Sequence, residues 1–84
     1  MKIHWDGKKK NLIGPKVRQL RMEQGLSQAK LAEKLQLLGL ECSDLTILRI
    51  EQGSRFVSDF EIAALAEYFQ VSADELLGRK NAKA

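Results

Sequence analysis

The side chains best suited to contact another molecule lie in one stretch, SDLTILRIEQG, which runs from Ser43 to Gly53. Ser43 is a favourable helix N-cap, and Gly53 suits the left-handed residue that ends a helix. In the helix between them, Ile47 and Ile50 are three positions apart and point inward together. The side chains available for contact are those of Ser43 itself, Asp44, Leu45, Thr46, Leu48 and Arg49.

These side chains match groups that DNA offers. Arg49 can donate two hydrogen bonds to guanine or bind a phosphate, and Thr46 offers a hydroxyl. Leu45 and Leu48 fit thymine methyl groups, although a contact with protein or partial burial is an alternative for both. Asp44 can accept from a cytosine amino group or serve the helix N-terminus. We favour the second role because phosphates repel a carboxylate.

Groups for catalysis and metal binding are sparse. The chain has one cysteine, Cys42, and one histidine, His4. A single cysteine excludes an internal disulfide, and the two residues are too few for a multi-Cys/His zinc site. The sequence shows no phosphate-binding loop and no cluster of carboxylates at metal spacing. We therefore expect no catalytic residues, no metal, no cofactor and no enzymatic activity, and we expect Cys42 to pack in the core.

The net charge of +3 on 84 residues conceals an asymmetry. Residues 1–34 carry nine Lys/Arg against three Asp/Glu, whereas residues 58–77 carry five acids and no base. This distribution suits a polyanion on one side of the domain, although mixed charge that only keeps the surface soluble is an alternative. No apolar run approaches the roughly 20 residues that span a bilayer. We expect a cytoplasmic protein without membrane contact.

Helix start and stop signals divide the rest of the chain. Helices are expected to begin after Asn11, at Gln28 behind the cap Ser27, at Asp44, after Ser58 and after Ser72. Ser58 with Glu61 and Ser72 with Glu75 have the spacing of capping boxes. Gly39 and Leu40 predict a Schellman ending for the second helix. The expected inward residues are Ile13, Val17, Leu20, Leu31, Leu35, Leu38, Ile62, Leu65, Ala66 and Phe69. With no strand signal, the sequence predicts an all-α fold of five helices around one core.

Four motifs resemble one known family. They are VxxLR at 17–21, GLSQxxLAxxL at 25–35, TIxxIExG at 46–53 and AxxFxVSxDELL at 66–77. Together they resemble the Cro/C1-type, or XRE-family, helix-turn-helix transcriptional regulators, which have a lambda-repressor-like fold. In comparison with that family, the connection between the second and third helices is about five residues longer. We expect Leu38, Leu40 and Cys42 to place the third helix across this lengthened turn.

The resemblance implies roles for further residues. It implies that helix 44–52 enters the major groove of double-stranded DNA while the second helix crosses the backbone. Gln28 is then expected to present its amide to a phosphate, although an ordinary exposed helix residue is the alternative. Arg55 and the lysines at 8–10 are further candidates for phosphate contact. Arg21 and Glu51 are expected to form a buried structural ion pair, the alternative being two unrelated surface charges.

The predicted organisation is a flexible basic arm at residues 1–11, a helix-turn-helix domain at 12–77 and a polar tail at 78–84. We expect a repressor-like, sequence-specific DNA-binding regulator that acts as a homodimer and needs no small-molecule ligand. Phe56, Phe60 and Tyr68 are candidates for the dimer surface or for the core. The alternative function is a protein-interaction or antitoxin-like module of the same fold.

Overall fold

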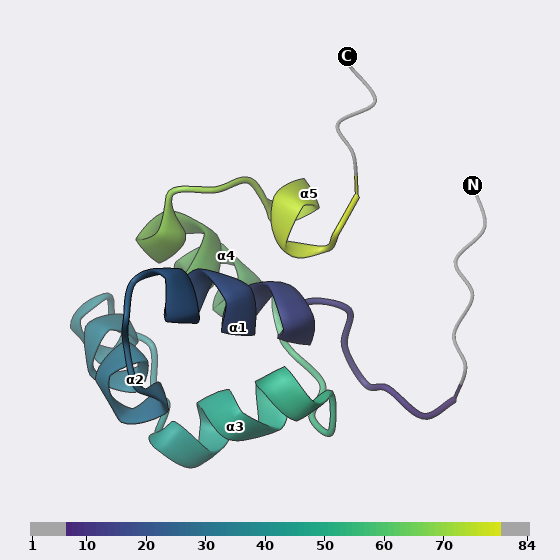
Figure 1. The fold of residues 1–84 in the computed structure, drawn as a ribbon, viewed down its shortest axis with the longest axis horizontal. Helices are drawn as coiled ribbons and strands as arrows, with labels where there is room; N and C mark the ends of the chain where they lie inside the picture. The colour runs from purple at the N-terminus through teal and green to yellow at the C-terminus, as the bar shows by residue number, and fades with distance from the viewer. Residues whose placement is uncertain (1–6, 80–84) are drawn as a thin grey trace.

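Five helices, connected by short loops, make up the part of the chain that the structure describes. The structure is a computed structural model of the chain, and it describes residues 7–79. The helices are α1 (Gly14–Glu23), α2 (Gln28–Leu37), α3 (Asp44–Gln52), α4 (Asp59–Phe69) and α5 (Ala73–Leu76), as Figure 1 shows. Residues 7–79 contain no strand, so the predicted all-α fold of five helices is confirmed. His4 and Trp5, in the predicted arm, lie outside the described residues.

Serine caps begin four of these helices, which explains why their starts could be located from the sequence. The side chains of Ser27, Ser43, Ser58 and Ser72 each accept a hydrogen bond from the amide three residues on. Ser58 and Glu61 complete the predicted capping box. The capping box predicted for Ser72 and Glu75 is only half formed: the Ser72 hydroxyl accepts from the Glu75 amide, but the Glu75 carboxylate does not return to the Ser72 amide. That carboxylate instead lies 3.6 Å from Nζ of Lys16.

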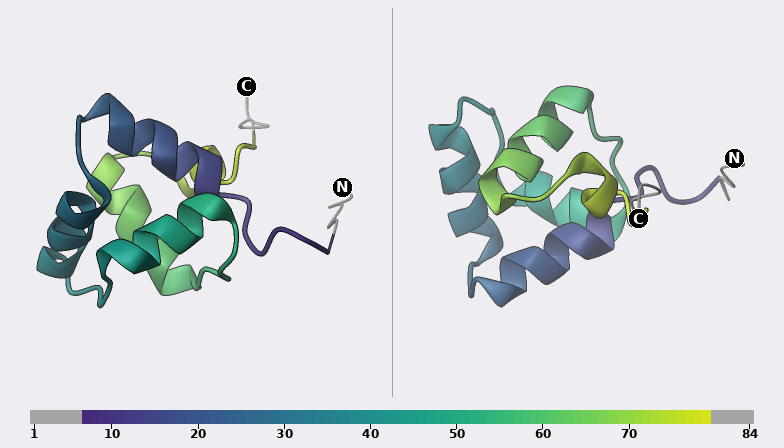
Figure 2. Two further views of the ribbon diagram at one scale, coloured as in Figure 1. Left: turned by 60° about the horizontal axis from the view of Figure 1, so that its bottom comes forward. Right: turned by 90° about the horizontal axis from the view of Figure 1, so that it is seen from above.

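The core is one apolar cluster. Each of the five helices contributes at least one side chain to it, and so does Ile13, the N-cap residue of α1. Its buried members are Ile13, Val17, Leu31, Ala32, Leu35, Ile47, Ile50, Leu65, Phe69 and Leu76. α3 packs against both α1 and α2, and the left view of Figure 2 shows α2 at one end of α3 and α1 above it. Ile47 and Ile50 therefore fasten α3 to the rest of the domain, and burial of apolar side chains supplies most of that attachment.

The connection between α2 and α3, residues 38–43, has the predicted ending. The Leu40 amide donates to the Leu35 carbonyl at 3.2 Å and the Gly39 amide to the Gln36 carbonyl at 2.9 Å, with φ +92° at Gly39. These two hydrogen bonds are those of a Schellman motif. Leu40 and Cys42 pack against the core, but Leu38 is 43% exposed. The prediction that Leu38 helps to place α3 is therefore wrong, because α2 has already ended and turned the side chain outward.

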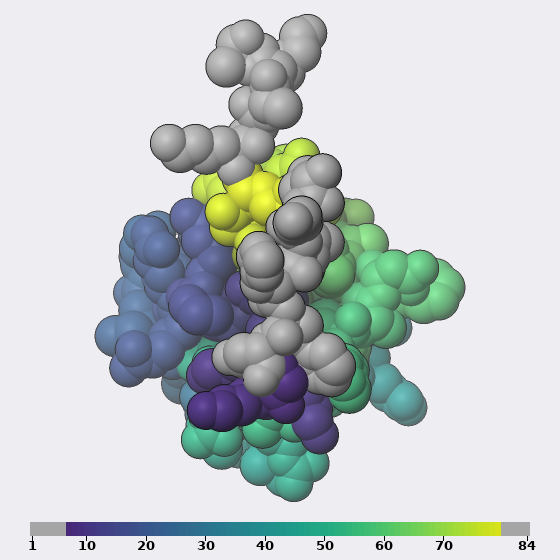
Figure 3. Space-filling model, turned by 90° about the vertical axis from the view of Figure 1, so that its right-hand side faces the viewer, coloured from purple at the N-terminus to yellow at the C-terminus, as the bar shows by residue number. Residues whose placement is uncertain are grey.

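α3 and α5 lie on opposite sides of α1. Figure 1 shows α3 below α1 and α5 above it, and Figure 3 shows the same separation from the side. The acidic residues of α5 are thus kept away from α3. None of the helices within residues 7–79 is long and apolar enough to cross a membrane.

Candidate nucleic-acid interface

The outer side of α3 is open to solvent. Leu45 is 45% exposed, Arg49 is exposed and Leu48 is half-buried. The guanidinium of Arg49 makes no hydrogen bond or ion pair with any other residue of the described chain, although its backbone carbonyl accepts from Ser54. The helix thus presents a cation and apolar groups outward while its opposite side is fixed in the core.

The polar residues at the start of α3 are used to begin the helix. Oγ of Ser43 accepts from the Thr46 amide at 3.3 Å, and Oγ1 of Thr46 accepts from the Ser43 amide at 3.1 Å. Oδ1 of Asp44 accepts from the Leu45 amide at 2.8 Å. Asp44 therefore has the helix-terminus contact that we favoured for it.

α1 holds α3 by an ion pair between Arg21 and Glu51. Nε of Arg21 lies 2.6 Å from Oε2 of Glu51, and the second pair of atoms, Nη2 and Oε1, is 3.1 Å apart. The two side chains are 12% and 4% exposed. The hydrogen bonds to Glu51, opposed by burial, raise the pKa of Arg21, while Nη1 also donates to the Leu26 carbonyl. The guanidinium thus joins α1, the α1–α2 turn and α3.

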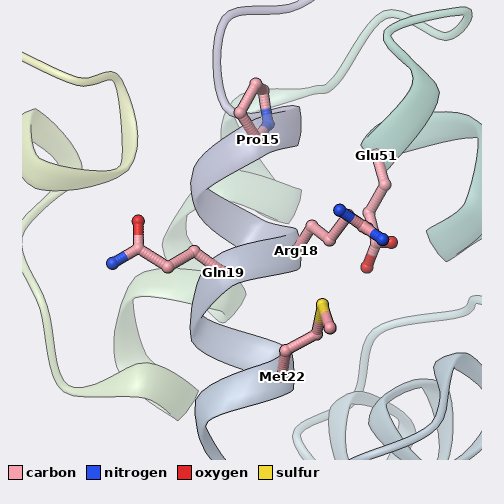
Figure 4. A pocket seen from close by; sticks show the side chains of 5 residues that line it. All are labelled: Pro15, Arg18, Gln19, Met22 and Glu51. Atoms are coloured by element: carbon pink, nitrogen blue, oxygen red, sulfur yellow. The ribbon is translucent and has the colours of Figure 1, made fainter.

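A pocket of about 310 Å³ lies beside this ion pair, between α1 and α3. Its lining residues are Pro15, Arg18, Gln19, Met22 and Glu51 (Figure 4). In Figure 4 the exposed Arg18 side chain extends toward Glu51 from α1. The Glu51 carboxylate is therefore faced by a second cation.

The structure places the Gln28 amide in this same network. Nε2 of Gln28 donates to Oε1 of Glu51 at 3.2 Å, and the residue is half-buried at the start of α2. An amide nitrogen carries two hydrogens, so one remains for an acceptor outside the domain. Gln28 thus links the first turn of α2 to α3, a contact that sequence reasoning did not foresee.

Arg55 also has a partner that the sequence did not reveal. Its Nη1 donates to Oε1 of Glu61 at 2.9 Å and to the Phe56 carbonyl at 3.0 Å. The hydrogen bond to Glu61 raises the pKa of Arg55. Burial pushes the pKa of Glu61 upward, but the hydrogen bonds from Arg55 and Ser58 outweigh it, so that pKa is lowered. Arg55 is thus held against the start of α4, with part of its guanidinium left exposed.

Cys42 lies close to this pair and is not activated. Its Sγ is 3.6 Å from the Ala32 carbonyl oxygen, and the side chain packs against the core. Burial and the charge of Glu61 raise the pKa of the Cys42 thiol, although Arg55 opposes this. A raised pKa disfavours the thiolate, which is the reactive form.

Residues 9–11 bind the far end of α3. The Lys10 amide donates to the Gly53 carbonyl at 2.8 Å, and Nζ of Lys9 donates to the Gln52 carbonyl at 3.3 Å. Nδ2 of Asn11 donates to the carbonyls of Ile50 and Arg55, at 3.1 and 2.8 Å. In Figure 3 the purple start of the described chain lies against teal α3. Two lysines therefore extend the positive charge of the α3 side.

Two features of this interface were missed. Asn11 was predicted only as a cap, and its Oδ1 does accept from the Gly14 amide at 2.9 Å, but its contacts with Ile50 and Arg55 were not expected. Gln52 was not predicted as part of the interface, but it is exposed on α3. Its position, four residues after Leu48 and seven after Leu45, places it on the same side of the helix and could have identified it.

Comparison with known proteins agrees with this geometry. A family model described as a helix-turn-helix domain matches residues 12–77, most of the chain. No curated protein and no solved structure matched the chain. A helix-turn-helix domain suggests DNA binding, implies DNA as a partner and is typical of non-enzymatic regulators. With its second and third helices, α2 and α3, packed together and α3 exposed along one side, the chain belongs to the helix-turn-helix domain family.

Proposed function

We propose that this protein is a repressor-like transcriptional regulator of the Cro/C1-type that binds specific double-stranded DNA sequences through α3 in the major groove. The observation that carries the proposal is the arrangement of α3. Ile47, Ile50 and the Arg21–Glu51 ion pair fix one side of the helix, and Leu45 and Arg49 face outward on the other. A recognition helix needs both properties, because base contacts require a rigid and exposed element.

The surrounding charges support contact with the DNA backbone. Lys9 and Lys10 are anchored at the end of α3, and part of Arg55 is exposed beside them. Gln28 and the amides of the first turn of α2 offer a helix N-terminus, where an anion is favoured. Such phosphate contacts position the protein and supply affinity without reading sequence.

A homodimer would double the number of base pairs read, with half-sites about one helical turn apart. Exposed aromatic side chains are candidates for the dimer contact, although Phe56 among them lies beside the α3 end, where Nζ of Lys10 is 5.6 Å from its ring centroid. Phe56 and Phe60 are exposed, while Tyr68 is half-buried and donates its hydroxyl hydrogen to Oε1 of Gln24 at 2.9 Å. Phe60 is therefore the better candidate for the dimer surface. Sedimentation of the protein with and without DNA tests this assignment.

The exposed apolar side chains favour a second candidate function, a protein-interaction or antitoxin-like module. Leu37 is 82% and Phe60 is 79% exposed, so both side chains are accessible to a protein partner. In that case substitution of Leu37 or Phe60 should abolish binding to the partner, and substitution of Arg49 should have little effect on it.

A salt titration of binding to labelled duplex DNA separates the two functions. A protein that makes about six phosphate contacts loses roughly a thousandfold in affinity between about 50 and 200 mM salt. Arg49→Ala should weaken binding by at least tenfold at a fixed salt concentration. Arg79→Ala is the matched control, since it removes the same charge from the α5 end of the domain. Salt-independent binding, or equal effects of the two variants, would contradict the proposal.

A further inference from the structure

The outer side of α3 has few hydrogen-bonding groups left for DNA. The hydroxyls of Ser43 and Thr46 each accept from the other residue's amide and lie 3.3 Å from one another. The Asp44 carboxylate accepts from the Leu45 amide. The polar side chains of the first turn, which would usually be the first candidates for base recognition, are therefore engaged in holding the helix start.

What remains on that side is mostly apolar. Leu45 is close to half exposed in the first turn, and Leu48 follows it one turn later. Arg49 lies beside Leu48, and its guanidinium has no partner in residues 7–79. Gln52 adds an exposed amide, but it lies at the opposite end of the helix from the residues that usually reach base edges. The side chains of this helix that are open to base edges and have no role in holding the helix are therefore mainly two leucines and one arginine.

We infer that this protein recognises thymine through its C5-methyl group, using Leu45 and Leu48, and guanine through Arg49. The inference rests on the proposed DNA binding and specifies its chemistry. Thymine carries the one apolar group at the major-groove edge of the base pairs, whereas guanine presents the two acceptors that a guanidinium matches. The preferred half-site is therefore one in which thymines adjoin a guanine.

The charges beside the leucines favour DNA over an apolar protein partner. Arg49 borders the apolar side chains, and Lys9 and Lys10 are fixed at the end of the same helix by hydrogen bonds to Gln52 and Gly53. A docked apolar helix would leave the guanidinium of Arg49 without a counter-charge, whereas DNA supplies a phosphate row next to the thymine methyls.

Removal of single methyl groups from the DNA tests the inference. Sequences bound from a pool of random duplexes are determined first, and each thymine of the preferred site is then replaced by uracil, which lacks only the C5-methyl group. We expect a three- to fivefold loss of affinity at one or two positions of each half-site, as expected from the burial of about one methyl group. Loss of guanine N7, by use of 7-deazaguanine, should weaken binding at an adjoining position.

Variants of the protein assign the effect to a side chain. In Leu45→Ala the difference between thymine and uracil should disappear at one position, and in Leu45→Met it should persist. Leu37→Ala is the control, because it removes an even more exposed leucine from α2 and should leave the difference unchanged. Duplex binding with no thymine in the preferred site, or with no methyl effect at any thymine, would overturn the inference and leave the proposed function standing. Failure to bind any duplex would overturn both.

Discussion

Nε of Arg21, in α1, lies 2.6 Å from Oε2 of Glu51, in α3, and the pair is almost completely buried. The Glu51 carboxylate accepts hydrogen bonds from Arg21 through both oxygens and from Gln28, in α2, through Oε1. Three helices therefore meet at one carboxylate. Since α3 carries the candidate interface, this charge network ties the orientation of that interface to the stability of the domain.

Loss of either charge should destabilise the fold. Arg21→Met or Glu51→Met strands the other charge in a buried site, at a cost of about 3–5 kcal/mol in the free energy of unfolding. The double variant should cost less than the sum of the two, because no charge is left unpaired. Denaturant unfolding of the four proteins measures this. Lys30→Ala, which breaks an exposed pair with Glu33, should cost at most about 0.5 kcal/mol. Additive effects of the two Met substitutions would contradict the coupling.

Acid should weaken the domain partly through Glu61. Its pKa is lower in the folded protein than the ordinary value of 4.5, so its contribution to stability is complete above that value. The contribution is lost as the pH falls through the lowered pKa, because the protonated carboxyl no longer pairs with Arg55. Glu61→Gln should therefore reduce the dependence of the unfolding free energy on pH below about 4.5. Glu67→Gln changes an exposed residue of the same helix and should leave that dependence nearly unchanged.

Asn11 should contribute more to the stability of the fold than a residue that only caps α1. Its side chain accepts from the Gly14 amide and donates to two carbonyls near the end of α3, so Asn11→Ala removes three hydrogen bonds at a half-buried site. At about 0.5–1.5 kcal/mol each, the loss in the free energy of unfolding is about 1.5–4.5 kcal/mol. Gln19→Ala removes one exposed hydrogen bond, to Glu23, and serves as the control. Equal thermal midpoints for the two variants would show that the α3 contacts add nothing.

The substitution Gly14→Ala tests how closely the backbone of α1 packs against the end of α3. A Cβ atom at this position would lie 2.5 Å from the Ile50 carbonyl oxygen and 3.0 Å from that of Glu51. Ala is intrinsically favoured over Gly in a helix by up to about 1 kcal/mol, so a purely local effect of Gly14→Ala would stabilise the protein. We expect the opposite sign, with a loss of about 1–3 kcal/mol, because backbone atoms must move apart. Thermal unfolding decides the sign.

The helix starts were predictable because they depend on contacts within four residues. A serine hydroxyl three positions before a free amide is a local arrangement, and it recurs at Ser27, Ser43 and Ser58. The Schellman ending at Gly39 is equally local. The exception was Glu75, whose carboxylate lies near Lys16 of α1 instead of its own cap, because a distant cation competed with the local amide.

Apart from the exposed Leu38, the sequence by itself determined an all-helical domain, its helix starts and the inward side of each helix, because local hydrogen bonding and apolar spacing decide these. Only the tertiary structure decided how the polar side chains around α3 pair. Asn11 reaches carbonyls 39 and 44 positions away along the chain, Gln28 turns toward Glu51 and Arg55 selects Glu61. Such pairs depend on how the helices pack in space, because residues far apart in the sequence become neighbours only when the core closes.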